Sequence, residues 1–402
     1  MHRTTTALLT TAAAVLAAAA LAPASEPTLH AARTQTTTLI SRSTTGGVPD
    51  GPSTNPVISG DRRYARVIAF QSAASNLVAG DTNGRTDVFA IERGGTFANE
   101  GTPWVPGKTI LVSRGLGGKP ANGPSFAPDV DGNFRTAPRC VAFLSAASNL
   151  VKGDTNGRVD AFVSHGPGES ISRLPLPGGK QPTAAATGVA VSGDCSHAAF
   201  VAGGALYTRA GGATHRVTGA AHPADPSFAQ GETNDLVFGA DGGVYMSRDG
   251  TGAAKRIATG GRNPAYNAIK RQVVAYEKHL GTAVQVMWRD LGQPEHVASS
   301  TGGSIGDRDS RNPVVVNSGY YVGFESDATN LGATPGTQAY LYTDVRKLTQ
   351  VRSVDNAGAP LPGGGRHPAV SFYANYILFS SPAPLGAASG ADQIFMRYLG
   401  GK

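Results

Sequence analysis

Two stretches of the chain carry oxygen-bearing side chains at a spacing that could hold a metal ion. Each reads GDTNGR and is followed two residues later by an aspartate. The candidate ligands are Asp81, Asn83 and Asp87 in the first stretch and Asp154, Asn156 and Asp160 in the second. Carboxylate and amide oxygens that alternate in this way resemble a compact calcium loop. They are also typical of a tight turn, in which Asp and Asn bond to the nearby backbone and Gly accepts a positive φ.

Two later loops favour the turn. Residues 329–340 (TNLGATPGTQAY) and 383–395 (APLGAASGADQIF) keep the loop length but lose most of the acids. Because the geometry does not need a metal there, we expect turns in all four loops, with calcium as the alternative for the first two. No other cofactor is expected.

The remaining candidates for chemistry are weak. The run Gly302-Gly303-Ser304-Ile305-Gly306 fits G-x-S-x-G, but that motif makes a nucleophile only on a sharp strand-to-helix turn, and no helical pattern follows it here. The histidines form no H-x-H or HExxH pair, so we expect them on the surface or at caps. Those in the repeat region are His165, His197, His215, His222, His279, His296 and His367.

Two cysteines and one tryptophan complete the set. Cys140 and Cys195 are the only cysteines, and in an oxidising compartment they could form a disulfide; two separate buried thiols are the alternative. Trp104 lies between Pro103 and Pro106. We expect it to pack over its own hairpin; the alternative is an exposed ring that stacks on a sugar or a partner.

An internal repeat determines which elements hold these residues. Residues 67–89 (VIAFQSAASNLVAGDTNGRTDVF) and 140–162 (CVAFLSAASNLVKGDTNGRVDAF) share AASNLV and GDTNGR at identical spacing. The segments ahead of them, LISR at 39–42 and LVSR at 111–114, match as well. This similarity indicates a duplication.

Fainter copies extend the repeat to seven units. A β-branched residue opens each unit: Ile40, Val112, Ile171, Val217, Ile257, Val297 and Val351. A proline comes next in most units, where we expect the first residue of a strand, and Gly188 replaces it in the third: Pro56, Pro128, Pro226, Pro264, Pro313 and Pro368. An apolar run then ends in an aromatic residue: Phe70, Phe143, Phe200, Phe238, Tyr276, Phe324 and Phe379. A further run follows: Phe89, Phe162, Tyr207, Tyr245, Val286, Tyr340 and Phe395.

Each unit therefore reads as four short strands separated by turns. Units of this kind, 40 residues or more in length, are typical of the blades of a β-propeller. We predict an all-β ring of seven four-stranded blades; six is the alternative, because the third to fifth units are faint. The chain starts with an isolated strand and ends after a third strand at 393–398. Residues 38–42 are thus predicted to supply the missing outer strand of the last blade.

The unit SR…G…P…S…VAFxSxAxNLVxGDTNGxxDVF resembles the PD40 (WD40-like) repeats of TolB-type propellers, and most of all the secreted versions in high-GC Gram-positive bacteria. The resemblance covers residues 39–398 and is specific in the first two units. It implies the propeller fold, export and a binding or scaffolding role, without shared catalytic residues. TolB itself resembles a six-bladed ring, so a count of seven departs from it.

The N-terminus reads as an export signal. One positive charge, an Ala/Leu/Thr run over 4–21 and Ala22-Pro23-Ala24 indicate a cleaved signal peptide at 1–24. We expect a flexible leader at 25–38 and one propeller domain at 39–402, with no transmembrane span in the mature chain. The formal charge is +7, and Arg3 is the only charge in the signal peptide. Lys and Arg form no run, which argues against a nucleic-acid partner.

The loop lengths suggest where a ligand would bind. In a propeller the loops that join strands 2 and 3, and strand 4 to the next strand 1, share one face. The 2–3 loops are long in units 1, 2, 6 and 7, at 71–87, 144–160, 325–338 and 380–392, and short in units 3 to 5. We therefore expect a wall of loops beside a lower shelf, and ligand sites favour such concavities.

The sequence thus predicts a secreted or envelope-associated, monomeric, non-enzymatic protein that binds a protein or polysaccharide. The alternative is a polysaccharide lyase or hydrolase. It would require three carboxylates or histidines that meet at one point near the axis of the ring.

Overall fold

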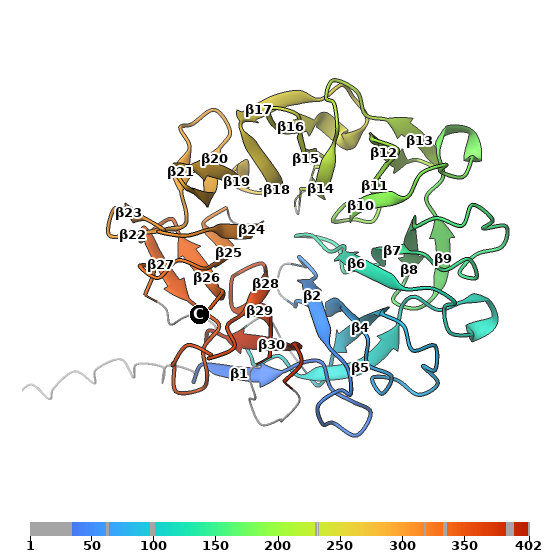
Figure 1. Cartoon of the computed structure of the whole chain (residues 1–402), viewed down its shortest axis with the longest axis horizontal. Helices are drawn as coiled ribbons and strands as arrows, with labels where there is room; N and C mark the ends of the chain where they lie inside the picture. The colour runs from blue at the N-terminus through green and yellow to red at the C-terminus, as the bar shows by residue number, and fades with distance from the viewer. Residues whose placement is uncertain are drawn as a thin grey trace, which may run out of the picture. The chain divides into compact units, whose positions relative to one another are not determined.

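Short strands joined by tight turns pair with their neighbours in sequence and build seven four-stranded sheets. The computed structural model describes residues 34–61, 64–96, 101–229, 231, 233–316, 319–332, 336–382 and 390–400. The predicted signal peptide and most of the predicted leader lie outside these residues. The sheets stand around a common axis as the blades of a seven-bladed β-propeller (Figure 1). The predicted fold class and blade count are confirmed.

The blades are numbered from the first complete sheet, and their strands are given from the innermost to the outermost. Blade 1 holds β2 (Ser53–Ile58), β3 (Val67–Ser72), β4 (Asp87–Arg93) and β5 (Pro106–Leu111). Blade 2 holds β6 (Ser125–Val130), β7 (Cys140–Ser145), β8 (Asp160–His165) and β9 (Ser170–Arg173). Blade 3 holds β10 (Ala186–Val191), β11 (His197–Ala202), β12 (Ala205–Ala210) and β13 (Ala213–Arg216). Blade 4 holds β14 (Ala224–Phe228), β15 (Leu236–Ala240), β16 (Gly243–Ser247) and β17 (Lys255–Thr259).

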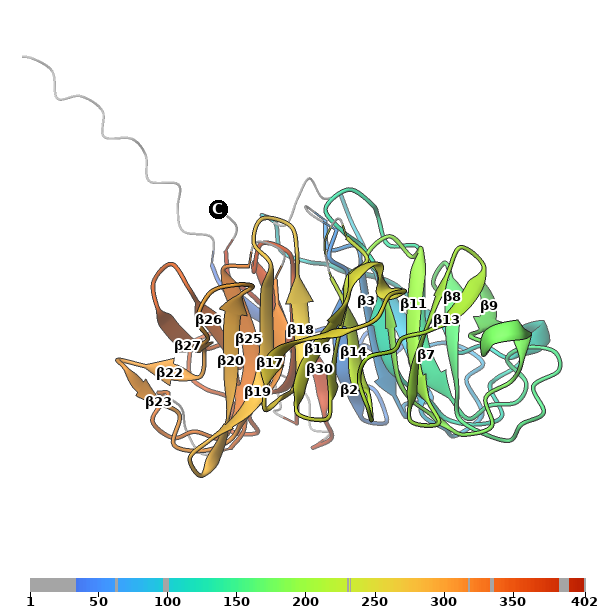
Figure 2. The same ribbon diagram turned by 90° about the horizontal axis from the view of Figure 1, so that it is seen from above.

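Blade 5 holds β18 (Gly261–Asn267), β19 (Val273–Leu280), β20 (Ala283–Asp290) and β21 (His296–Val297). Blade 6 holds β24 (Ser310–Val315), β25 (Tyr321–Ser326), β26 (Gln338–Thr343) and β27 (Leu348–Val351). Blade 7 holds β28 (Arg366–Val370), β29 (Tyr376–Ser381), β30 (Gln393–Tyr398) and β1 (Thr36–Leu39). A hairpin of β22 (Ser300–Thr301) and β23 (Ser304–Ile305) projects from the side of the ring (Figure 2). The 3-10 turns are η1 (Leu116–Gly118), η2 (Pro177–Gly179) and η3 (Arg248–Gly250).

The N-terminal strand closes the ring. β1 pairs with β30 in antiparallel register from Thr36 opposite Tyr398 to Leu39 opposite Phe395. The strand starts two residues before the predicted boundary and ends three residues earlier, so residues 36–38 belong to the blade rather than to a leader. It ends because the chain turns away from the sheet after Ile40, whose N–H still bonds to the Ile394 carbonyl at 2.8 Å.

The aromatic positions of the repeat lie in the core of the blades. Stacked ring pairs join the second and third strands of six blades: Phe70–Phe89, Phe143–Phe162, Phe200–Tyr207, Phe238–Tyr245, Phe324–Tyr340 and Phe379–Phe395. In blade 5 the residue opposite Tyr276 is Met287. The expected partner Val286 is one position off, because the pairing register was not visible in the sequence. Further apolar clusters fill the spaces between neighbouring blades.

The repeated prolines were expected to start the inner strands. In the structure they lie inside these strands instead. In β2, for example, the pairing with β3 shifts between Thr54 and Val57, so Pro56 sits in a bulge. A bulge leaves one residue outside the ladder of hydrogen bonds, and a proline without an N–H is tolerated there. No helix among the described residues is long and apolar enough to cross a membrane.

Candidate functional site

The bulges of the inner strands build a ring of unusual backbone around the axis. In six blades the residue before the proline has a φ of 45° to 52°: Asn55, Ala127, Asp225, Asn263, Asn312 and His367. Asn and Asp tolerate this left-handed conformation better than other L-residues, which accounts for four of the six. The sequence analysis missed this ring. The recurring dipeptide of a residue plus proline was its only signal.

This ring lines the mouth of a channel along the axis. Five of its members, Asn55, Ala127, Asn263, Asn312 and His367, line a cavity of about 330 Å³, which we call the mouth. An inner cavity of about 180 Å³ continues from it, with shared walls that include Val57, Val314 and Pro368. The inner walls are mainly aliphatic. A ligand entering the mouth would therefore meet amides and an imidazole first and an apolar chamber below them.

An aromatic pair lies at the inner end of this chamber. Phe372 lines the inner cavity and its ring contacts that of Phe134, with the centroids 5.9 Å apart. Phe372 follows β28 of blade 7, and Phe134 follows β6 of blade 2. Because blade 1 lies between these two blades, the ring pair passes over the turn that follows the inner strand of blade 1. The two rings place an apolar floor opposite the mouth.

Side chains of neighbouring blades hold the bulges in place. Glu277 of β19 accepts hydrogen bonds from Arg262 Nε at 3.0 Å, from Asn263 Nδ2 at 2.8 Å and from the backbone N–H of Asn312 at 3.0 Å. Glu325 likewise accepts the N–H of His367 at 2.6 Å. A left-handed residue takes its N–H out of the strand ladder, so that group needs another acceptor. The acceptor comes from the preceding blade, which links the ring members across blades.

Two carboxyl groups beside the axis have raised pKa values. Burial raises the pKa of Asp129 to about 6, although its bonds to the N–H groups of Val191 and Val130 oppose the shift. Burial also raises the pKa of Asp225, and the charge of Glu277 adds to this effect. Both carboxyl groups therefore take up a proton at a higher pH than a fully exposed aspartate does.

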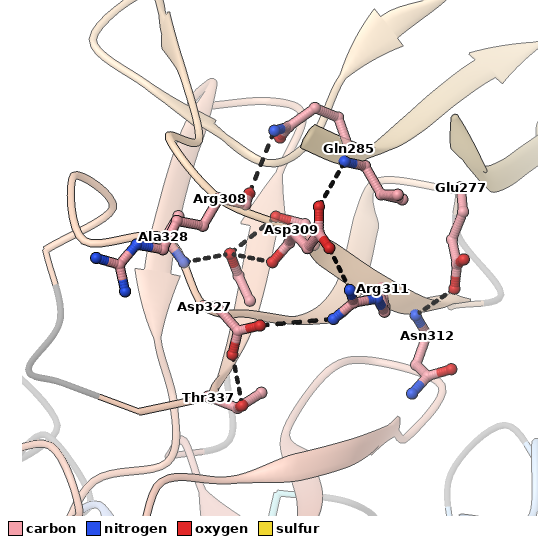
Figure 3. Close-up of polar contacts among 12 residues, drawn as sticks. Glu277, Gln285, Arg308, Asp309, Arg311, Asn312, Asp327, Ala328 and Thr337 are labelled. Atoms are coloured by element: carbon pink, nitrogen blue, oxygen red, sulfur yellow. Dashed lines mark hydrogen bonds and ion pairs between the residues drawn. The ribbon is translucent and has the colours of Figure 1, made fainter. Parts of the chain in front are cut away.

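A second cavity lies outside the mouth, between blades 5 and 6, and has a volume of about 440 Å³. Its acids are already partnered, as Figure 3 shows: Arg311 bonds to Asp309 and lies 3.5 Å from Asp327. The Thr337 hydroxyl bonds to Asp327 at 2.6 Å, and Asp309 accepts the N–H of Val284 at 2.7 Å. These contacts join the two blades, and we assign this network a structural role.

The asparagines of the two GDTNGR loops make hydrogen bonds within and beyond their loops. Asn83 Nδ2 donates to Asp87 at 2.6 Å and to the Ala121 carbonyl at 3.1 Å, and its Oδ1 accepts the N–H of Arg85 at 2.8 Å. Asn156 makes the corresponding bonds to Asp160, to the Pro182 carbonyl and to the N–H of Arg158. The two sets lie in separate blades, and each Asn fastens its loop to the connection that follows the blade.

The Asp at the start of the third strand acts as an acceptor that needs no charge. Asp87 accepts the hydroxyl of Ser113 at 2.7 Å. Blades 5, 6 and 7 make the same contact with glutamine: Ser299 to Gln285, Ser353 to Gln338 and Ser41 to Gln393. In blade 2 the cation Arg173 lies 3.2 Å from Asp154 and 3.8 Å from Asp160. These contacts favour the turn over the calcium site.

A pH titration with and without calcium tests this interpretation. Burial, together with the charge of Asp87, raises the pKa of Asp81 to about 6, above the usual unfolded value of about 3.9. The folded state thus binds the proton more tightly, so stability is gained as the pH falls from 7 to 5 and lost as it rises through 6. We expect a higher melting temperature at pH 5.5 than at pH 8, and a smaller difference between the two in Asp81→Asn. We expect no effect of Ca²⁺ at about 1 mM, which is close to the dissociation constants of the weakest calcium sites in proteins.

The control for this titration is Asp50→Asn. The hydroxyl of Ser75 lowers the pKa of Asp50, so Asp50 is ionised in the folded and the unfolded state from about pH 5.5 to 8. Its removal should leave most of the profile unchanged, because the charge of Asp50 is only the smallest cause of the raised pKa of Asp81. A calcium-dependent rise of the melting temperature at pH 8 would show that the loops bind the metal.

Cys140 and Cys195 form a disulfide between blades 2 and 3, with their Cα atoms 6.1 Å apart. Asp131 lies beside it and accepts the N–H of Cys140 at 2.9 Å, and burial raises the pKa of Asp131 to about 7. Within the described part of the chain, these three residues are the only His, Cys, Asp or Glu group close enough to share an ion. Their sulfurs are used by the disulfide.

The other sequence candidates do not meet. Ser304 lies in the exposed strand β23, with another strand rather than a helix after it. Of the histidines in the described part of the chain, only His367 lines the mouth. Trp104 is 4% exposed and donates from Nε1 to the Ala65 carbonyl at 2.7 Å. The alternative of an exposed Trp104 ring is wrong, because the ring is packed among apolar side chains of blades 7 and 1.

No family model and no curated protein matches the chain. Its fold is similar to that of the β-propeller domain of the Trilobed protease from Pyrococcus furiosus, with 9% identity over 87% of this chain and 94% of that one and a TM-score of 0.50. It is also similar to oligogalacturonate lyase from Vibrio parahaemolyticus, with 9% identity over 91% and 97% and a TM-score of 0.50. TolB from Acinetobacter baumannii aligns with 12% identity over 71% and 82% and a TM-score of 0.39. At these identities the likeness shows the fold alone.

Proposed function

We propose that this chain is an exported, monomeric, non-enzymatic binding protein that engages a protein or polysaccharide partner through the mouth of its axial channel. The observation that carries the proposal is the ring of polar side chains on left-handed bulges. A non-glycine residue in this conformation costs about 1–3 kcal/mol. Such strain recurs at ligand sites, where it serves to aim side chains, and here it recurs around one opening.

The ring leaves hydrogen-bonding groups free for a ligand. Asn312 Oδ1 accepts a bond from Asn263, but Asn312 Nδ2 has no protein partner among the described residues. The Nδ1 atom of His367 has none either, but it is buried, so the amide of Asn312 is the group open to a ligand. Groups held in place by neighbouring blades and left unpaired suit recognition of an extended polar chain, with an apolar group in the chamber below.

The lengths of the loops around the mouth also support this face of the ring as the binding face. On this side the second and third strands are joined by residues 73–86 in blade 1 and 146–159 in blade 2. In blades 3, 4 and 5 only residues 203–204, 241–242 and 281–282 join them. The predicted asymmetry of loop lengths is thus present in the strand bounds. A partner would meet a wall of long loops on one half of the rim and a shelf on the other.

Binding is favoured over catalysis by what lines the channel. The described residues place no three carboxylates or histidines within ligand distance of a common point on the axis. The lyase or hydrolase alternative needed such a group, and no observation here favours it. Export rests on the N-terminal sequence, which lies outside the described residues.

Glycine substitutions in the ring test the proposal with little change to the backbone, because glycine accepts the same φ. We expect Asn55→Gly with Asn312→Gly to weaken binding of the mature chain to its partner in envelope extract or on a glycan array by about tenfold. The matched control is Ala374→Gly, a left-handed residue in the turn after β28 on the opposite face. Equal binding by the ring variant, or turnover of the bound partner, would refute the proposal.

A further inference from the structure

A pocket on the outer side of the ring is lined by three cations, two of which have no ion pair among the described residues. It lies between blades 4 and 5 and has a volume of about 420 Å³. Arg248, Lys255 and Arg289 line it, together with Met246, Ile257 and Leu291. We call it the outer cationic pocket. It is remote from the mouth, since its residues lie in or next to the third and fourth strands of blade 4 and the third strand of blade 5.

Arg289 is the most unusual of its residues. One nitrogen, Nη1, donates to the Ile257 carbonyl at 3.3 Å, which joins the two blades. Its Nε is buried and has no hydrogen-bond partner, and no carboxylate pairs with this guanidinium among the described residues. The buried Nε is unfavourable, because it has lost water and gained no acceptor. The remaining nitrogen, Nη2, is not among the buried atoms, so an oxyanion in the pocket would bond to that nitrogen.

The other two cations differ in how far they are neutralised. Arg248 bonds to the buried carboxylate of Asp235 at 2.6 Å, so its charge is largely balanced. Lys255 is exposed and has no ion pair among the described residues. The charge of Arg289 also acts on Glu295. Burial tends to raise the pKa of Glu295, but bonds from Lys278 and Tyr276 and the charge of Arg289 outweigh burial and lower it. Because Glu295 is already shared by those two groups, it does not neutralise the pocket.

The floor of the pocket is apolar. Met246 is 4% exposed, and Ile257 and Leu291 are half-buried. Two unneutralised cations above an apolar floor fit a ligand that has a charged head and a hydrocarbon body. The guanidinium fork matches carboxylate and phosphate oxygens, and Lys supplies a second point charge.

We propose that the outer cationic pocket binds an amphipathic anion, with a carboxylate or phosphate head between Arg289 and Lys255 and a short apolar chain or ring on Met246, Ile257 and Leu291. The site is separate from the proposed binding mouth, so either can fail without the other.

Calorimetry of the mature protein with decanoate, decyl phosphate and inorganic phosphate tests the site. We expect saturable binding of one decanoate or one decyl phosphate per chain. Arg289→Gln should weaken it about tenfold or more and Lys255→Gln about threefold to tenfold. The two amphiphiles distinguish a carboxylate from a phosphate preference. Inorganic phosphate should bind at least about tenfold more weakly, because it cannot use the floor.

Arg256→Gln is the matched control. It removes the same charge from the same strand, but the residue lies between Lys255 and Ile257 and faces the other way, near Gly242. It should leave binding unchanged, as should Asn55→Gly with Asn312→Gly. The inference is overturned if no amphiphile binds, if Arg256→Gln weakens binding as much as Lys255→Gln, or if inorganic phosphate binds as tightly as decyl phosphate. Melting temperatures of the variants separate lost binding from lost folding.

Discussion

A mature chain that starts at Arg42 instead of Thr34 is expected to lose much of its stability and to expose blade 7. The truncation removes β1 and leaves the outer edge of β30 unpaired from Phe395 to Tyr398. It also removes Ile40, which is fully buried in the cluster between blades 7 and 1. Loss of such a side chain alone costs about 2–5 kcal/mol.

Further bonds disappear with the strand. The Thr37 hydroxyl bonds to the Val354 carbonyl at 2.6 Å, and the Ser41 hydroxyl bonds to Gln393 at 2.9 Å; both contacts are buried. Other links across the same boundary remain, such as the hydroxyl of Tyr398 to the Gly101 carbonyl at 2.7 Å. We therefore expect blade 7 to open first, while the rest of the ring keeps its order.

Thermal melting and hydrogen exchange measure this result. The truncated chain should melt at a lower temperature, and amides of β29 and β30 should lose protection before those of blades 3 to 5. A chain that starts at Thr34 is the control and should match the full mature chain. An unchanged melting temperature for the chain starting at Arg42 would mean that β1 does not close the ring.

The second large effect is expected from the disulfide. Cys140 and Cys195 are separated by 55 residues in sequence, and a cross-link over a loop of this length contributes about 4 kcal/mol in the chain-entropy model. It joins β7 of blade 2 to the turn before β11 of blade 3. We expect Cys140→Ala with Cys195→Ala to lower the free energy of unfolding by about this amount.

Denaturant unfolding with and without reductant checks the value. Reduction of the wild-type protein should shift the midpoint in the same direction as the double variant, and reductant should not affect the variant itself. Equal midpoints for oxidised and reduced wild type would show that blade packing alone holds blades 2 and 3 together.

Much of the architecture was predictable because its determinants are local. The two GDTNG repeats have identical internal spacing, and a repeat unit with four runs and turn residues between them folds into the same small sheet each time. The chain also begins with one isolated strand, and its last unit has only three strands, so the first strand completes the last blade. These features specified seven blades and the closing strand, apart from its exact bounds.

The ring at the mouth could not be predicted in the same way. A proline that starts a strand and a proline inside a bulge look alike in sequence. What separates them is the register of the neighbouring strand, as between Thr54 and Val57 in β2. Likewise Asn83 could ligate a metal or fasten a turn, and its bond to the Ala121 carbonyl, 38 residues away, appears only when the next connection is in place.

The sequence alone therefore determined the class of fold and the strand that closes the ring, and it favoured seven blades over six, since repeat spacing and turn residues act within each unit. Only the tertiary structure decided which side chains meet. Asn55 and Asn312 share the mouth, and Lys255 and Arg289 share the outer pocket, although each pair is far apart in the chain. Contacts between blades depend on how the blades pack around the axis, and no local pattern encodes that arrangement. The bonds of Asn83 favour a turn in the first loop considered for calcium, and the proposed binding groups lie at the mouth.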